Sequence, residues 1–297
     1  MKKTYLPHLA LLSTNIIYGL NYNVAKWLMP EYLLPFSFIF SRVLFAGLLF
    51  WIFSAFRNHL KIEKNDFPRM ILCGLFGVAL NQLMFFYGLN LTSPVNASVI
   101  MVITPVLVLL FAAFIIKERI TKRKISGILM GITGALLLIL LGSDSSSLSS
   151  SSGDLFIFLN AASYAVYLVI AKPLLLKYDA IQVNKWTFLF GFMFVFPFGF
   201  EQFSEIEWSS FDSKVWSAFA FVILGTSFIA YLFNAYGLKK LNPSAVSIYI
   251  YIQPLTATIV AIALGSGKLD LVNVISALLI FAGVFLVSNP RFTSRRA

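Results

Sequence analysis

The stretch PVNASVIMVITP, residues 94–105, has a counterpart later in the chain, PSAVSIYIYIQP, residues 243–254. The two stretches lie 149 residues apart, and this offset superimposes a proline at each end and a serine inside. The tripeptide Tyr-Gly-Leu at 87–89 also recurs at 236–238 with the same offset. Unrelated apolar runs share scattered leucines, whereas prolines held at one spacing indicate an internal duplication.

The composition around this repeat is that of a membrane protein. Of the 297 residues, 59% are hydrophobic and only 12% are charged, whereas soluble domains carry about 25% charged residues. Each apolar segment is near the roughly 20 residues that cross a bilayer as a helix, and the alternation of a membrane barrel is missing from the sequence. The ten segments lie at 6–29, 34–54, 67–89, 94–116, 125–141, 154–171, 182–200, 215–238, 243–263 and 272–288.

Charge alternates between the loops that join these segments. One set of loops carries 18 of the 23 lysines and arginines, and the opposite set carries three. The opposite set also holds eight of the twelve acidic residues. The positive-inside rule then places both termini in the cytoplasm and supports ten spans. Because the basic residues form short clusters between apolar runs, the sequence predicts a lipid bilayer as partner and no nucleic acid.

A serine-rich polar segment divides the chain in two. We expect a first five-helix repeat over 1–142, a flexible non-cytoplasmic connector over 143–153 and a second repeat over 154–297. Since five is odd, the second repeat enters the membrane from the opposite face. The predicted fold is therefore all-α, with ten transmembrane helices arranged as two inverted repeats around a central cavity.

Polar and aromatic residues recur at helical spacing on several segments, which places them on single helix faces. For any one of them, a helix-to-helix hydrogen bond worth about 0.6 kcal/mol is the favoured interpretation. Taken together, they predict a polar, tyrosine-rich substrate pathway. The candidates are Asn15, Tyr18, Tyr22, Arg42, Asn81, Gln82, Ser98, Asn160, Tyr164, Tyr167, Ser227, Tyr231, Asn234, Ser247, Tyr251 and Gln253.

Arg42 is the clear charge inside a predicted span, roughly 12 Å deep at 1.5 Å per residue. It could bind a substrate carboxylate, but a structural bond to backbone carbonyls is favoured. Lys26 and Lys172 end their spans and are expected to reach the membrane interface. No Asp or Glu lies at mid-depth in the predicted spans, which favours facilitated diffusion or exchange over proton coupling. Sodium bound by backbone carbonyls stays open.

Two prolines lie in the middle of predicted spans at matching places, Pro105 and Pro254. Such prolines kink a helix, and these kinks could act as hinges or simply shape the packing. Gly127, Gly131 and Gly134 form a stripe that permits close helix contact. Internal packing is favoured over dimerisation, so a monomer is expected.

Catalytic and metal-binding patterns are missing from the sequence. Cys73 is a lone cysteine, the two histidines lie at predicted cytoplasmic ends, and no paired carboxylate or HExxH pattern occurs. We therefore expect no metal, no cofactor and no enzyme activity. A purely structural membrane protein would leave the mirrored prolines unexplained.

Several stretches resemble the EamA-type branch of the drug/metabolite transporter superfamily. They are SRVLFAGLL around Arg42, YGLNLTSPVNASVIMVITPVL (87–107), FIIKERIT (114–121) and YGLKKLNPSAVSIYIYIQPL (236–255). The resemblance implies export of metabolites such as amino acids through a central cavity lined by the first, third, fourth, sixth, eighth and ninth spans. It also implies an acidic residue in the second copy at the position equivalent to Glu118, where this chain has Gly267.

The leading hypothesis is an exporter of small neutral or zwitterionic metabolites that works by alternating access. Tyrosine-rich faces and one buried charge suit such a solute. The alternative within transport is a nucleotide-sugar or sugar-phosphate exchanger, which needs several cationic contacts. The expected location is the plasma membrane, as a multi-pass protein of a bacterial inner membrane.

Overall fold

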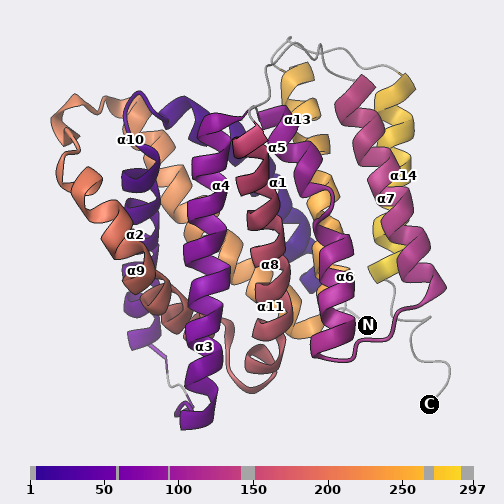
Figure 1. Cartoon of the computed structure of the whole chain (residues 1–297), viewed down its shortest axis with the longest axis horizontal. Coiled ribbons are helices and arrows are strands. Elements are labelled where there is room, and N and C mark those ends of the chain that lie inside the picture. Colours follow the sequence, from indigo (N-terminus) through magenta and orange to yellow (C-terminus); the bar gives the residue numbers. More distant parts are fainter. Residues whose placement is uncertain (1–4, 58–59, 93, 142–150, 264–270, 289–297) are drawn as a thin grey trace.

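The computed structural model describes residues 5–57, 60–92, 94–141, 151–263 and 271–288 (Figure 1). Within these ranges the chain is helical and contains no strand. In the described part of the chain, six helical runs are long and apolar enough to cross a membrane: Pro35–Ala55, Lys64–Leu91, Ala97–Ile115, Ser152–Lys177, Ala180–Ser204 and Ser213–Lys240. The chain is thus a multi-pass membrane protein. The count of ten spans stays a prediction.

The first half holds seven helices within its described residues: α1 (Leu6–Leu28), α2 (Pro35–Ala55), α3 (Phe67–Gly74), α4 (Leu80–Leu91), α5 (Pro94–Met101), α6 (Thr104–Ile115) and α7 (Lys122–Leu141). The second half, over its described part, holds α8 (Ser151–Lys177), α9 (Ala180–Ser204), α10 (Ser213–Ala220), α11 (Ala230–Lys240), α12 (Pro243–Ser247), α13 (Ile252–Ala263) and α14 (Leu271–Ser288). Most of the connector expected at 143–153 lies outside the described residues.

The two halves repeat one another in local detail. The π-helical turn η2 (Leu75–Ala79) joins α3 to α4, and the longer π-helical turn η4 (Phe221–Ile229) joins α10 to α11. The offset of 149 places η2 within η4. A π-helical turn releases backbone carbonyls from their usual partners, and such turns often mark functional sites.

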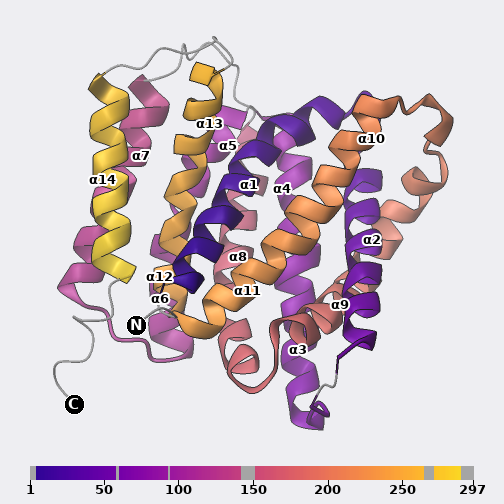
Figure 2. The same ribbon diagram turned by 180° about the vertical axis from the view of Figure 1, so that it is seen from behind.

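The halves are intertwined rather than set side by side. α1 packs against α11 and α13 of the second half, and its counterpart α8 packs against α4 and α6 of the first. Counterpart helices also meet directly, α2 with α9 and α7 with α14. Figures 1 and 2 show α7 and α14 side by side at one end of the molecule. Neither half buries its apolar faces alone.

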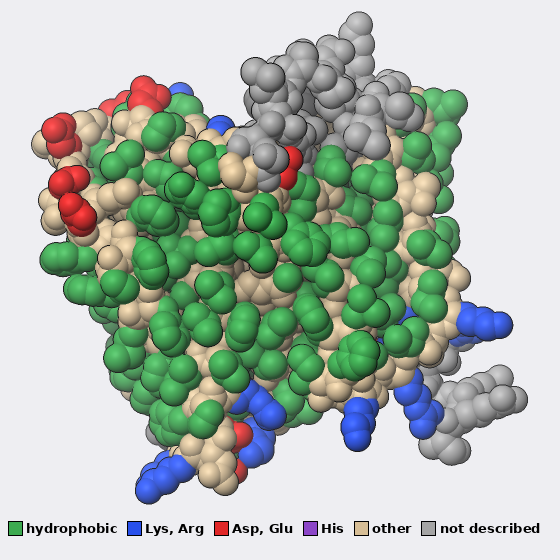
Figure 3. All heavy atoms as spheres, viewed as in Figure 1, with side chains coloured by type: hydrophobic (Ala, Val, Ile, Leu, Met, Phe, Trp, Pro, Cys, Tyr) green, Lys and Arg blue, Asp and Glu red, His purple; other side chains and the backbone are tan. Residues whose placement is uncertain are grey.

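Charged side chains gather at the edges of an apolar belt. In Figure 3 most lysines and arginines lie along the lower edge, whereas acidic side chains cluster at the upper left. α1 begins and α14 ends near the lower edge (Figure 1). This separation has the sense that the positive-inside rule requires, and the membrane side of each edge stays a prediction.

The prolines expected to kink mid-span helices instead follow breaks in them. α5 ends at Met101 and α6 begins at Thr104, so Pro105 lies in the first turn of α6. Proline has no N–H to offer the carbonyl four residues earlier, and the Thr104 hydroxyl donates to that carbonyl, Met101 O, at 2.7 Å. In the second half, the 3₁₀ turn η5 (Ile248–Tyr251) separates α12 from α13, and Pro254 follows it. A hinge role for either proline stays a prediction.

The glycine stripe of α7 packs inside the chain. A Cβ atom on Gly127 would lie 2.8 Å from the Gly283 carbonyl, and one on Gly134 would lie 2.8 Å from the Ser276 carbonyl, both on α14. Gly131 instead faces the ring of Tyr251. These glycines let the backbones of α7 and α14 approach closely, as the preference for internal packing anticipated.

Candidate functional site

A cavity of about 80 Å³ lies between the two halves. The cavity is lined by Tyr18, Asn21, Tyr22, Arg42, Asn81, Gln82, Phe85, Phe86, Met101, Asn160, Tyr164, Tyr231, Ile250 and Gln253. Nine of these are candidates predicted from sequence; they come from α1, α2, α4, α8, α11 and α13. No Asp or Glu belongs to this described lining.

Four other candidates support lining residues from behind. Asn15 accepts a hydrogen bond from the Gln253 side chain at 2.9 Å, and Ser227 accepts one from Arg42 at 2.9 Å. The Asn234 amide donates to the Tyr164 hydroxyl. Tyr167 is 2% exposed and packs over Gly77. These side chains position the lining without forming part of it.

The remaining candidates lie outside the cavity lining. The Ser247 hydroxyl donates to the Ser244 carbonyl at 3.1 Å, within the turn of α12. Tyr251 is fully buried against Gly131. Ser98 is half-buried on α5. Their helical spacing gave no means of telling a cavity face from a face turned to a neighbouring helix.

Five lining residues escaped the sequence analysis. Asn21 lies three residues after Tyr18, and Phe85 and Phe86 lie three and four after Gln82, so helical spacing could have found them. Met101 and Ile250 are apolar residues inside apolar runs. Their signal is the repeat: they are 149 residues apart, and each lies at the helix break of its half, Met101 at the end of α5 and Ile250 within η5.

Among the described residues Arg42 bonds a side-chain hydroxyl, whereas the sequence interpretation favoured backbone carbonyls. Its side chain is 3% exposed, and Nε donates to the Ser227 hydroxyl. That hydroxyl donates in turn to the Val222 carbonyl at 3.0 Å, within the π-helical turn η4. The guanidinium carbon lies 4.4 Å from the ring centre of Phe86. In the part of the chain that the structure describes, no carboxylate pairs with Arg42.

Two amide side chains are held in one orientation by their neighbours. The Asn160 Nδ2 donates to the Asn81 carbonyl at 2.6 Å. The Gln82 Nε2 donates to the Tyr231 hydroxyl at 3.3 Å, and that hydroxyl donates to the Gly77 carbonyl at 3.0 Å. Since a carbonyl can only accept, flipping the Asn160 amide would bring two oxygens together. Neither amide oxygen has a hydrogen-bond partner among the described residues.

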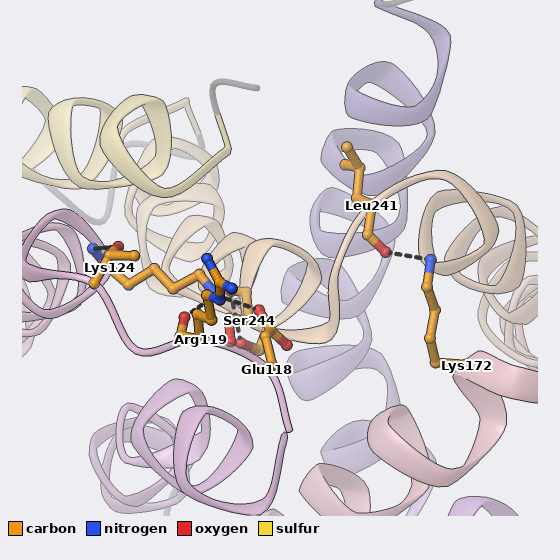
Figure 4. A network of polar contacts seen from close by, with 8 residues as sticks. Glu118, Arg119, Lys124, Lys172, Leu241 and Ser244 are labelled. Carbon is orange, nitrogen blue, oxygen red and sulfur yellow. Dashed lines mark hydrogen bonds and ion pairs between the residues drawn. The ribbon is translucent and has the colours of Figure 1, made fainter. Parts of the chain in front are cut away.

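Lys26 and Lys172 both bind the carbonyl end of a neighbouring helix, and their position relative to the membrane interface stays a prediction. The Lys26 ammonium donates to the carbonyls of residues 89, 90 and 92, at the end of α4, over 2.8–3.3 Å. The Lys172 ammonium donates to those of 238, 239 and 241, at the end of α11, over 2.8–3.2 Å. The last carbonyls of a helix lack partners within it, which explains the attraction. Figure 4 shows the bond from Lys172 to the Leu241 carbonyl.

Glu118 forms a buried ion pair close to this second cap. Its carboxylate lies 2.6 Å from the Lys124 ammonium, and the two side chains are 6% and 7% exposed. In Figure 4 Glu118 lies beside Ser244 at the start of α12. The position equivalent to Glu118 in the second half, Gly267, lies outside the described residues.

Comparisons with known proteins agree with this arrangement. The profile of the EamA-like transporter family matches residues 6–140 and 151–289. The uncharacterized transporter YyaM of Bacillus subtilis is 29% identical over 97% of this chain and 96% of its own. A probable terminal-alkyne amino-acid exporter of Streptantibioticus cattleyicolor is 28% identical over 79% of this chain and 77% of its own. A crystal structure with 20% identity superimposes with a TM-score of 0.72 over 95% of both chains, which shows a shared fold.

Proposed function

This chain belongs to the EamA-like transporter family, and we propose that it exports small neutral or zwitterionic metabolites, with amino acids as the first candidates. The chain is a membrane transporter of the drug/metabolite type by its family. The substrate and the direction of transport are the proposal.

One observation carries the choice of substrate: the cavity combines a single cation with tyrosines and uncharged amides. Among its described lining residues, Arg42 is the one charged group. A small solute with no net charge can enter such a site without leaving a second charge unpaired. The relative named as a probable amino-acid exporter supports the same class.

Sugar phosphates and nucleotide sugars suit this cavity less well. A phosphate carries up to two negative charges and is held by several arginines or lysines in most proteins. Lys26 and Lys172 are the other cations considered for the pathway, but their ammonium groups donate to carbonyls at helix ends. This alternative therefore has no observation in its favour.

We further propose that ten helices span the plasma membrane as two inverted repeats, 1–142 and 154–297, with both termini in the cytoplasm. The matched helices and the charge-separated edges of Figure 3 support this arrangement. Because no carboxylate lines the described cavity, transport is proposed to run as uncoupled exchange or diffusion. The internal glycine seam supports a monomer, and the transporter family supports a role other than catalysis.

Counterflow in proteoliposomes tests the proposal. Vesicles loaded with an unlabelled amino acid should accumulate the labelled form transiently, with and without a proton gradient. A panel of neutral amino acids would be compared with a sugar phosphate and with empty vesicles. The absence of counterflow for every amino acid would contradict the substrate class, and sustained accumulation driven by the proton gradient would contradict uncoupled transport.

A further inference from the structure

Several buried polar atoms on residues that line the cavity have no hydrogen-bond partner in the described part of the chain. They are Arg42 Nη1 and the side-chain oxygens of Asn21, Gln82 and Asn160, all on residues that line the cavity. The four side chains are 2–5% exposed. Buried polar groups are nearly always hydrogen-bonded, and a group that is left without a partner costs about 1–3 kcal/mol. Their convergence on one cavity therefore points to a ligand.

The unpaired atoms are of two kinds. Arg42 offers a cationic donor, because its Nε is already used on Ser227 and the described chain supplies no carboxylate for its terminal nitrogens. Gln82 and Asn160 offer acceptors, because the bonds to Tyr231 and the Asn81 carbonyl fix their NH₂ groups away from a ligand. The site thus presents one positive donor and a group of neutral, electron-rich oxygens.

A carboxylate is the natural partner of the donor. Bonds between guanidinium and carboxylate are charge-assisted and about twice as strong as neutral ones. The bond to Ser227 and the contact with the Phe86 ring fix the plane of the guanidinium before a ligand arrives. Pre-organisation of this kind leaves less entropy to be lost on binding.

A primary ammonium is the natural partner of the oxygens. It carries three N–H donors and no acceptor, and the amides of Gln82, Asn160 and Asn21 supply three unpaired oxygens. A lone amine would bring a second positive charge into a cavity that already holds Arg42. A lone carboxylic acid would leave the oxygens unpaired.

We propose that the cavity recognises the zwitterionic head group of an α-amino acid, with Arg42 on the carboxylate and the side-chain oxygens of Gln82 and Asn160 on the ammonium. This inference rests on the proposed transport function and specifies how its substrate is selected. Phe85, Phe86 and Tyr22 provide the apolar wall for a side chain. Selection then depends on both ends of the head group rather than on the side chain alone.

Matched ligands test the inference on the unmodified protein. L-Leucine and L-phenylalanine would each be compared with the methyl ester, which lacks the carboxylate, and with the α-hydroxy acid, which lacks the ammonium. Binding would be followed by intrinsic tryptophan fluorescence in detergent, and transport by competition in counterflow. We expect each amino acid to bind at least about tenfold more tightly than either analogue, the effect of losing one charged hydrogen bond.

Two variants separate the two ends of the head group. Arg42→Gln should remove the preference for the amino acid over its ester while the preference over the hydroxy acid persists. Gln82→Met should weaken the second preference and leave the first. Thr133→Ala, an exposed substitution on α7, is the matched control and should change neither.

The outcomes distinguish this inference from the function it rests on. Counterflow of amino acids with equal competition by esters and hydroxy acids would overturn the head-group recognition and keep the transport function. Tight, selective binding without counterflow would keep the recognition and overturn the transport function. Failure of both amino acids to bind would overturn the recognition. A variant that lowered the affinity for all three ligands equally would show a structural role for that residue.

Discussion

Lys26 and Lys172 occupy equivalent places in the two halves, 146 residues apart, and each holds three carbonyls at the end of a counterpart helix. Lys26 lies in the last turn of α1 and caps α4, while Lys172 lies in α8 and caps α11. α1 and α8 run in opposite directions in Figure 1, so the two caps lie at opposite edges of the molecule. The repeat has preserved a contact and not merely a residue type.

Replacing either lysine by methionine should destabilise the fold. Lys26→Met or Lys172→Met keeps the length of the side chain but leaves buried carbonyls unpaired, at about 1–3 kcal/mol. The expected result is a melting temperature lower by a few degrees, since 1 kcal/mol corresponds to roughly 2–4 °C in a chain of 150–250 residues. Thermal unfolding in detergent, read by a maleimide dye on the buried Cys73, measures this.

Lys240→Met is the matched control, because Lys240 is an exposed lysine on α11. It should leave the melting temperature within a degree of the unmodified protein. Equal melting of the Lys26→Met variant and the unmodified protein would show that the carbonyls at the end of α4 find other partners.

At this scale the sequence was only partly informative. Helical spacing selected nine residues that line the cavity, because polar residues on one helix face point the same way. It could not distinguish Tyr18, which lines the cavity, from Tyr251, which packs on Gly131, because both are tyrosines on polar stripes. The partner of Arg42 was also hidden, since its contact with Ser227 depends on a π-helical turn that periodicity does not reveal.

The close contact between α7 and α14 restricts which residues can occupy their interface. Their backbones meet through glycines, and the contact of Gly127 with Gly283 has its repeat counterpart in the contact of Ser276 with Gly134. A Cβ atom on Gly283 would lie 2.5 Å from the Gly127 carbonyl and 3.0 Å from the Gly131 amide nitrogen. Backbone atoms cannot rotate away as a side chain does, so the helices themselves must separate.

Gly283→Ala should therefore destabilise the fold although it adds one methyl group. Overpacking of this kind costs about 1–3 kcal/mol, and the same dye-based melting measurement would record it. Gly47→Ala on α2 is the control: its added Cβ would lie 3.7 Å from Phe188 Cβ, an ordinary contact. That variant should melt at or slightly above the unmodified temperature, because alanine favours a helix over glycine by about 1 kcal/mol. Similar melting of the two variants would contradict a tight seam.

The elements themselves were largely foreseeable. Apolar runs near 20 residues marked each helical region, since a membrane helix must satisfy its backbone internally. The internal breaks were not foreseeable from hydropathy, because the residues around Val102 and Ile248 are as apolar as a continuous span. Proline indicated where each break lies but suggested a kink, whereas Thr104 supplies the bond that allows a full interruption.

For the molecule as a whole, the direction in which the chain enters the membrane can be measured. In a Cys73→Ala background, Arg57→Cys should react with an impermeant maleimide only in inverted vesicles, and Glu205→Cys only in intact cells. Both positions are exposed, one after α2 and one at the end of α9. The expectation follows from the separation of basic and acidic side chains at the edges of the apolar belt.

The Cys73→Ala protein without an added cysteine is the control and should not be labelled. Labelling of both positions from the same side of the membrane would refute the inverted arrangement of the halves. Labelling from opposite sides, but in the reverse sense, would keep the inversion and place the termini outside.

The two halves differ most sharply where the ligand would lie. If the spacing of 146 residues between Lys26 and Lys172 is carried on into α2 and α9, Arg42 corresponds to Phe188, a fully buried ring packed between Phe50 and Tyr231. In alternating access the two halves exchange conformations between the inward-open and outward-open states. Because one half carries Arg42 and the other Phe188 at this position, the two states should differ in free energy. The carrier should therefore rest mainly facing one compartment and show unequal half-saturation on the two faces. Detailed balance still forbids an uncoupled carrier from accumulating its substrate against a gradient. The difference between the halves therefore determines the resting conformation, and the metabolite gradient alone determines the direction of net transport.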